Sequence, residues 1–182
     1  FITLFIDDIL QYHLLEMKKE MSFWKTLNKQ HLIYKIFFIF FFYSTFSSAE
    51  TIKPDIKIDP YQVVIIQLNS LKNNDNPVID SGIEQTWEFA HPDNKINTGP
   101  LEKFKKMIKG DAYKMLLNHL DHEIIQEKVT ESKALFEVRI LDKNKSYFKF
   151  KWQVERYNKE GPLLGCWLTT AVSSPAPLGS SI

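Results

Sequence analysis

The sequence is short of several features that would point directly to a function. Cys166 is the single cysteine among 182 residues, so no intrachain disulfide can form and packing alone must hold the fold. The formal net charge is +1, and the residues after Ala49 carry 18 basic and 18 acidic side chains. A surface without net charge has no long-range field that gathers nucleic acid, so we expect no nucleic-acid binding. Phosphate-binding glycine loops, paired-cysteine zinc patterns and serine-nucleophile elbows are also missing.

What the chain does have is one uninterrupted hydrophobic run near its start. Residues 36–43 are all apolar or aromatic; Lys35 precedes them, and the small residues Ser47 and Ala49 follow. A basic flank, a hydrophobic run and small residues in this order are typical of a secretory signal peptide. We therefore expect an exported protein that is cleaved after Ala49.

The signal peptide defines residues 1–49 as a leader, with Met17 or Met21 as the expected start of translation. An uncleaved membrane anchor made of residues 32–46 stays open as the alternative. This segment has fifteen positions and includes a lysine, whereas a membrane-spanning helix needs about twenty apolar residues. Contact with a membrane is expected only through this leader, and residues 50–59 are interpreted as a linker.

Three helices are predicted after the linker. Asp59 followed by Pro60 is a helix start, because Asp can accept hydrogen bonds from free backbone N–H groups and Pro suits the first turn. Apolar residues then recur three or four positions apart, which indicates amphipathic helices. We expect these helices over residues 60–72, 81–90 and 100–109, with a turn at 91–94.

Beyond Gly110 the apolar residues recur with a period of two. The clearest strand alternates Phe148, Phe150, Trp152 and Val154 with polar residues. Strands are expected over residues 123–129, 136–140, 148–155 and 163–172, followed by a flexible tail at 173–182. Helices followed by hairpin-connected strands predict an α+β domain over residues 60–172, with the helices packed on one face of a curved antiparallel sheet.

Several segments of this domain resemble a known but uncharacterised family of cyanobacteria, algae and plants. The segments are Tyr61 to Leu71 with Asn74-Asp75, Gly82-Ile83 to Phe89-Ala90, Gly99-Pro100-Leu101, Leu116-Leu117-Asn118-His119 and Trp167-Leu168-Thr169. That family is grouped with the cone-shaped nuclear transport factor 2-like and ketosteroid isomerase-like superfamily. The resemblance implies three helices against a curved sheet, and a periplasmic, thylakoid-lumen or secreted location, but no activity.

Two groups of titratable residues are candidate catalytic residues. Enzymes of the cone-shaped fold often use an Asp or an Asp–His pair inside the cavity, and His91 with Asp93 or His119 with Asp121 could act in this way. His119 and His122 would share a face only on a helix, and their segment precedes a strand, so no metal site is expected. No cofactor is expected either.

Tryptophans supply the candidate ligand-binding residues. Trp87, Trp152 and Trp167 could line a pocket for a flat apolar molecule, although their spacing is equally typical of core residues. Cys166 lies between apolar residues and is interpreted as a buried, unreactive thiol.

These observations support a first hypothesis and leave two alternatives open. The first is a non-catalytic module that binds a small apolar ligand or a partner protein. The second is a cofactor-free isomerase, dehydratase or hydrolase with an Asp or His in its cavity. A homodimer formed through the outer face of the sheet is the third, and the polar residues expected on that face argue against a large apolar interface.

Overall fold

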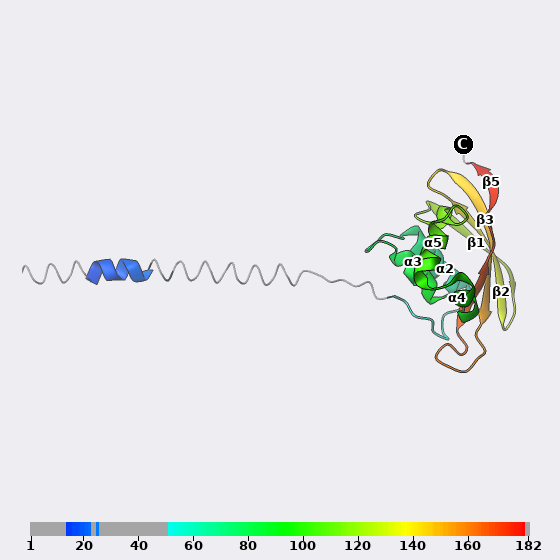
Figure 1. The fold of residues 1–182 in the computed structure, drawn as a ribbon, viewed down its shortest axis with the longest axis horizontal. Helices are drawn as coiled ribbons and strands as arrows, with labels where there is room; N and C mark the ends of the chain where they lie inside the picture. The colour runs from blue at the N-terminus through cyan, green and yellow to red at the C-terminus, as the bar shows by residue number, and fades with distance from the viewer. Residues whose placement is uncertain (1–13, 23–24, 26–50, 181–182) are drawn as a thin grey trace, which may run out of the picture. The chain divides into compact units, whose positions relative to one another are not determined.

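A computed structural model describes residues 14–22, 25 and 51–180 (Figure 1). The chain divides into two units, Phe1–Ser48 and Ala49–Ile182. In the first unit residues 14–22 are helical. The hydrophobic run, the cleavage position after Ala49 and the candidate anchor at 32–46 lie outside the described residues. Within the described residues, no helix combines the length and the hydrophobicity needed to cross a membrane.

Between residues 60 and 116 the second unit has four α-helices and one 3-10 helix. The first of these begins with a capping box, in which Asp59 Oδ1 accepts a hydrogen bond from the Gln62 N–H (2.8 Å) and Gln62 Oε1 accepts one from the Asp59 N–H (3.2 Å). The helices are α2 (Pro60–Lys72), α3 (Ser81–Glu88), α4 (Pro92–Thr98), α5 (Leu101–Lys109) and η1 (Lys114–Leu116).

Helix α4 lies where the sequence analysis placed only a turn. Pro92 occupies its first turn, and His91 Nδ1 accepts a hydrogen bond from the Asp93 N–H at 3.1 Å. None of the seven residues of α4 is buried. A helix without an apolar stripe leaves no periodic signal, which is why the pattern did not predict it.

The strands form one antiparallel sheet. Its strands are β1 (Asp121–Val129), β2 (Lys133–Leu141), β3 (Ser146–Arg156), β4 (Trp167–Val172) and β5 (Ala176–Ser180). The order is β1-β2-β3-β4, and β5 pairs with the first part of β3 while β4 pairs with its second part. The α+β prediction is therefore confirmed, with the helices of the second unit on one face of an open antiparallel sheet (Figure 1).

The C-terminal end of the sheet differs from the sequence-based expectation. β4 begins at Trp167 rather than at residue 163, because Gly165 has a positive φ of 82° within a turn. Part of the expected flexible tail, Ala176–Ser180, is strand β5 instead. β5 contains Pro177, and proline is tolerated in an edge strand because one side of that strand has no partner to receive an N–H.

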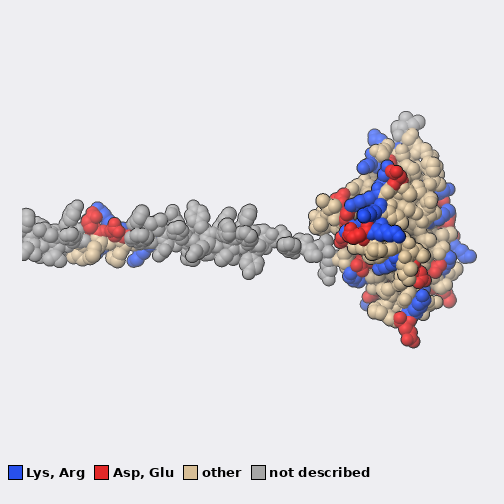
Figure 2. Space-filling model, viewed as in Figure 1, with Lys and Arg blue, Asp and Glu red and all other residues tan. Residues whose placement is uncertain are grey.

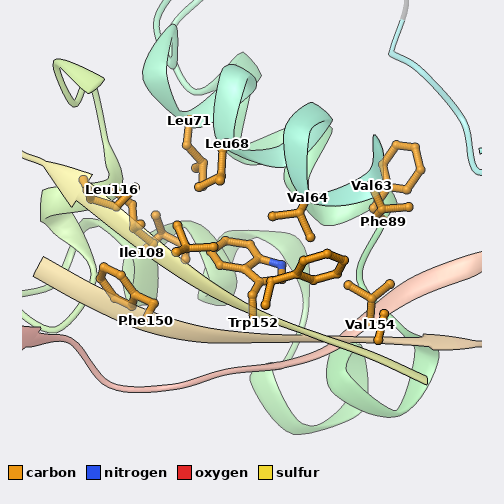
Figure 3. Close-up of a cluster of buried hydrophobic side chains, with 14 of the residues drawn as sticks. Val63, Val64, Leu68, Leu71, Phe89, Ile108, Leu116, Phe150, Trp152 and Val154 are labelled. Carbon is orange, nitrogen blue, oxygen red and sulfur yellow. The ribbon is translucent and has the colours of Figure 1, made fainter. Parts of the chain in front are cut away.

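The core lies between the helices and the inner face of the sheet. Phe150, Trp152 and Val154 alternate along β3 and are fully or almost fully buried, as the period of two predicts. Figure 3 shows Val64, Leu68 and Leu71 of α2 pointing toward the sheet and Trp152 rising from β3 toward them. The other fully buried apolar residues include Val63, Ile83, Phe89, Ala134, Phe136, Val138 and Ile140.

Residues 51–59, interpreted as a linker, are attached to the domain in the structure. Gln85 of α3 is buried, and its side-chain amide accepts a hydrogen bond from the Ile52 N–H (2.6 Å) and donates one to the Ile52 carbonyl (2.8 Å). Lys53 Nζ lies 2.9 Å from a carboxylate oxygen of Glu88. Ile52 is therefore held against α3 by two hydrogen bonds between its backbone and the Gln85 side chain.

Replacing Gln85 with alanine is expected to release this segment. Both hydrogen bonds to Ile52 are lost, and a net contribution of about 1 kcal/mol for each predicts an approximately tenfold or greater increase in opening of residues 51–53. Amide hydrogen exchange at Ile52 and Lys53, compared between the wild-type protein and Q85A, measures this opening. A Lys57→Ala variant serves as the matched control, since Lys57 is exposed. Equal exchange rates at Ile52 in the wild-type protein and Q85A would contradict the assignment.

Candidate functional site

A cavity of about 230 Å³ lies between the helices and the part of the sheet formed by β3 and β4. Its lining divides into two groups by burial. The buried floor consists of Gln67, Leu71, Thr86, Ala90, Phe104, Ile108, Leu116, Trp152 and Thr169. The partly or fully exposed mouth consists of Asn94, Thr98, Met107, Tyr113, Thr170, Ala171 and Val172.

A hydrogen-bond network joins four elements at the floor, namely α2, α3, β3 and β4. Gln67 Oε1 of α2 accepts hydrogen bonds from Trp152 Nε1 (3.1 Å) and Thr169 Oγ1 (2.6 Å). Gln67 Nε2 donates to the Thr86 carbonyl at 3.0 Å, and the Thr86 hydroxyl donates to the Gly82 carbonyl at 2.8 Å. Because its polar groups are paired with one another, the floor presents mainly apolar surface to the cavity.

The lining contains no aspartate, glutamate, histidine, lysine, arginine or cysteine. The one ionisable side chain among the lining residues is the phenol of Tyr113. The Tyr113 hydroxyl lies 3.3 Å from the Val172 carbonyl, to which it donates a hydrogen bond. The cavity is therefore suited to holding an uncharged molecule, and its lining offers no carboxylate or imidazole as a general acid or base.

His119 and His122 are adjacent in the structure but lie outside the cavity lining. The Leu116 carbonyl can only accept, so His119 Nδ1, 2.7 Å away, carries a proton, and His119 Nε2 accepts a hydrogen bond from His122 Nδ1 at 2.8 Å. Burial lowers the pKa of His119 to about 4 and also lowers the pKa of half-buried His122, while nearby Lys72 acts in the same direction. Both rings are therefore neutral at pH 7.

The other residues of the two candidate pairs, Asp121, His91 and Asp93, also lie outside the cavity lining. Asp121 is exposed, with Oδ1 3.8 Å from Lys72 Nζ, and the structure brings it near His119 without placing either in the cavity. His91 caps α4 through the Asp93 N–H, and its ring lies 5.3 Å from that of Tyr157. Among the described residues no group of three or more His, Cys, Asp or Glu side chains is arranged to hold a metal ion.

The three candidate tryptophans have different positions. Trp152 lies in the cavity floor. Trp87 packs against Phe104, with ring centroids 4.9 Å apart. Lys95 Nζ lies over the Trp87 ring, 5.3 Å from its centroid. Trp167 is buried, with the Arg156 guanidinium 5.0 Å from its ring centroid. Trp152 is therefore the one of the three that a ligand in the cavity would touch.

A second concave surface lies on the outer face of the sheet. It is a shallow groove of about 610 Å³ whose lining includes Asp121 and His122. Its charged side chains neutralise one another: Glu137 contacts Arg139 (3.0 Å) and Lys149 (3.7 Å), and Arg139 also contacts Glu123 (3.2 Å). Figure 2 likewise shows acidic and basic side chains interspersed on the visible face of the domain. Paired charges of this kind leave no unbalanced group to attract a ligand.

Sequence reasoning found Trp152 but missed Gln67, Thr86 and Thr169. One signal was present for Gln67. It stands three residues after Val64 and four before Leu71, so it occupies the buried stripe of α2. A polar residue in such a stripe needs a buried hydrogen-bond partner, which marks Gln67 as part of an internal polar site.

No protein-family model matches the chain, and neither the curated proteins nor the solved structures contain a match.

Proposed function

We propose that the second unit is a non-catalytic module that binds a small apolar molecule in the cavity between its helices and sheet. The observation that carries this proposal is the cavity itself: about 230 Å³ with a buried floor of mainly apolar surface and an accessible mouth. An engineered cavity of about 150 Å³ with an apolar lining binds benzene, so this volume is sufficient for a small organic ligand.

The enzymatic alternative has less support. A cofactor-free isomerase, dehydratase or hydrolase needs a general acid or base within reach of its substrate. The cavity lining contains only the Tyr113 phenol as a titratable group, and none of His91, Asp93, His119 and Asp121 belongs to it. Binding without catalysis accordingly accounts for the lining better than acid–base chemistry does.

The proposal extends to the fold and the location. Helices that precede an antiparallel sheet and enclose a cavity against it support membership of the cone-shaped nuclear transport factor 2-like superfamily. The order of Lys35, the apolar residues 36–43 and Ala49 supports export. N-terminal sequencing of the protein from its own cells tests the second point: Glu50 as the first residue is expected, and a chain retaining residues 32–46 would contradict cleavage.

Blocking the mouth tests the binding function. Val172 is half-buried at the mouth, so Val172→Trp is expected to fill the opening and weaken binding of toluene and of benzyl alcohol at least tenfold. For ligands of seven or eight heavy atoms we expect wild-type dissociation constants on the order of 1 mM or below, measured by ligand-observed NMR.

Val129→Trp is the matched control, because Val129 is an exposed strand residue outside the cavity lining. This variant should bind both probes as the wild-type protein does. The proposal fails if the wild-type protein binds neither probe, or if V172W, folded as judged by circular dichroism, binds both with unchanged affinity.

A further inference from the structure

The lining residues also restrict the charge of the ligand. A charged molecule that enters the cavity loses its hydration, and its burial is costly unless an opposite charge meets it. None of the side chains that line the floor or the mouth is charged at pH 7. An uncharged ligand avoids this cost, so the lining selects against carboxylates, phosphates and ammonium groups alike.

The volume restricts the size of the ligand. A cavity of about 150 Å³ accommodates benzene, with six heavy atoms, so about 230 Å³ accommodates a ligand of about nine heavy atoms. A single ring with a short substituent has this size. Larger molecules such as sterols or long-chain lipids would fit only if they extended well beyond the mouth.

The distribution of hydrogen bonds restricts the orientation of the ligand. At the floor, Gln67, Trp152 and Thr169 are already hydrogen-bonded to one another. At the mouth, the Asn94 side chain makes one long hydrogen bond, in which Nδ2 donates to the Thr169 carbonyl at 3.4 Å. The Thr98 hydroxyl donates to the Asn94 carbonyl at 2.9 Å and keeps its acceptor capacity. Hydrogen-bonding capacity is therefore greatest at the mouth, on α4.

We infer that the cavity takes an uncharged, single-ring molecule of about nine heavy atoms, whose apolar body lies against Trp152 and whose one hydrogen-bonding group lies beside Asn94. This inference rests on the proposed binding function and adds the ligand class to it. Asn94 is the specificity-determining residue, because it lines the cavity and its side-chain amide keeps hydrogen-bonding capacity, whereas the hydroxyl of Thr98, the other lining residue of α4, already donates to the Asn94 carbonyl.

A set of probes of one shape and different charge tests the ligand class. Benzyl alcohol, toluene, benzoate and benzylammonium are titrated into the full chain at pH 7, and dissociation constants are measured by ligand-observed NMR. We expect both uncharged probes to bind at least tenfold more tightly than either ion. If benzoate or benzylammonium binds as tightly as benzyl alcohol, the ligand class is wrong while the binding function stands. If no probe binds, the binding function itself fails.

Substitutions of Asn94 test the orientation. Asn94→Leu should weaken benzyl alcohol binding about threefold to tenfold and leave toluene binding unchanged, because only the alcohol loses a hydrogen bond. Asn94→Asp should strengthen benzylammonium binding, since it places a carboxylate at the mouth. Asn97→Leu and Asn97→Asp are the matched controls on the same helix, where Asn97 is exposed and outside the lining. Equal loss of toluene and benzyl alcohol binding in N94L, or equal effects at Asn94 and Asn97, would overturn the assignment.

Discussion

Replacing Gly82 with alanine is expected to destabilise the domain by about 3 kcal/mol or more, although alanine ordinarily stabilises a helix by roughly 0.5–1 kcal/mol relative to glycine. A Cβ atom at this position would lie 2.0 Å from the Ser70 carbonyl oxygen and 2.8 Å from the Asn74 Cα. Both neighbours are backbone atoms of α2 or of the turn that follows it, so no side chain can move aside. Helix α3 must shift away from α2, and the core between them must open.

Urea denaturation of the wild-type protein and of G82A measures this loss. Gly110→Ala is the matched control: its φ is −72°, and an added Cβ would be no closer than 3.2 Å to its nearest neighbour, the Met107 carbonyl oxygen. We expect this control to change the free energy of unfolding by less than about 1 kcal/mol. A G82A protein as stable as the wild type would show that α2 and α3 do not make this close contact.

The same contact illustrates which parts of the fold the sequence could predict. Residues close in the chain produced the correct prediction of α2, because Asp59, Pro60 and the apolar stripe act within one segment. The alternation along β3 was equally informative, because one face of that strand is buried. The close approach of Gly82 to Ser70 was not predictable in this way. Glycine is required there by a backbone atom of another helix, and such a contact leaves no periodic pattern in the sequence.

Elements without an apolar pattern were missed for a related reason. Helix α4 buries none of its residues, and all five residues of β5 are exposed, so neither segment has the periodicity that identifies helices and strands. β5 is stabilised by its backbone pairing with β3, which depends on long-range geometry. A periodic pattern of apolar residues identifies only helices and strands that have a buried face. Helix α4 and strand β5 have no buried residue, and hydrogen bonds hold them in position.

The candidate site was predictable only in part, because it is formed by distant residues. Gln67 and Thr169, whose side chains are 2.6 Å apart, are separated by 102 positions in the chain. Trp152 was found because it also belongs to the strand pattern. The titratable residues His91, Asp93, His119 and Asp121 were prominent in the sequence, yet they lie near the start of α4 and near the start of β1 and do not line the cavity. Chemical type alone therefore did not identify the residues that line the cavity.

Acidification from pH 6.5 to pH 4 is expected to cost the domain up to about 3 kcal/mol of stability through His119. A pKa of about 4 in the folded protein lies well below the value of 6.5 for an exposed histidine, and each pKa unit corresponds to about 1.4 kcal/mol. Because the folded-state pKa is depressed, the unfolded chain binds the proton first. The stabilising effect of the neutral ring is therefore complete above pH 6.5 and is lost as the pH falls toward 4.

The surroundings of His119 explain why the folded protein resists this proton. The ring is almost fully buried, the neighbouring His122 already donates a hydrogen bond to its Nε2, and Lys72 of α2 adds positive charge nearby. Asp121 acts in the opposite direction, but its side chain is exposed and reaches Lys72 as well. Burial is the largest of these influences, so the effect should persist at high salt, where the contribution of Lys72 is screened.

Urea denaturation at several pH values between 7.5 and 4.5, in the wild-type protein and in His119→Asn, isolates the contribution of this ring. Asparagine keeps a donor for the Leu116 carbonyl but does not titrate, so H119N should lose much less stability than the wild type over this interval. The interval lies above the lowered pKa of Asp75, whose carboxylate is held ionised mainly by its hydrogen bond from Asn118, so protonation of Asp75 contributes little. Parallel pH profiles for the two proteins would mean that the ring is hydrated, and the close contact of His119 with Leu116 and His122 would then have to open in solution.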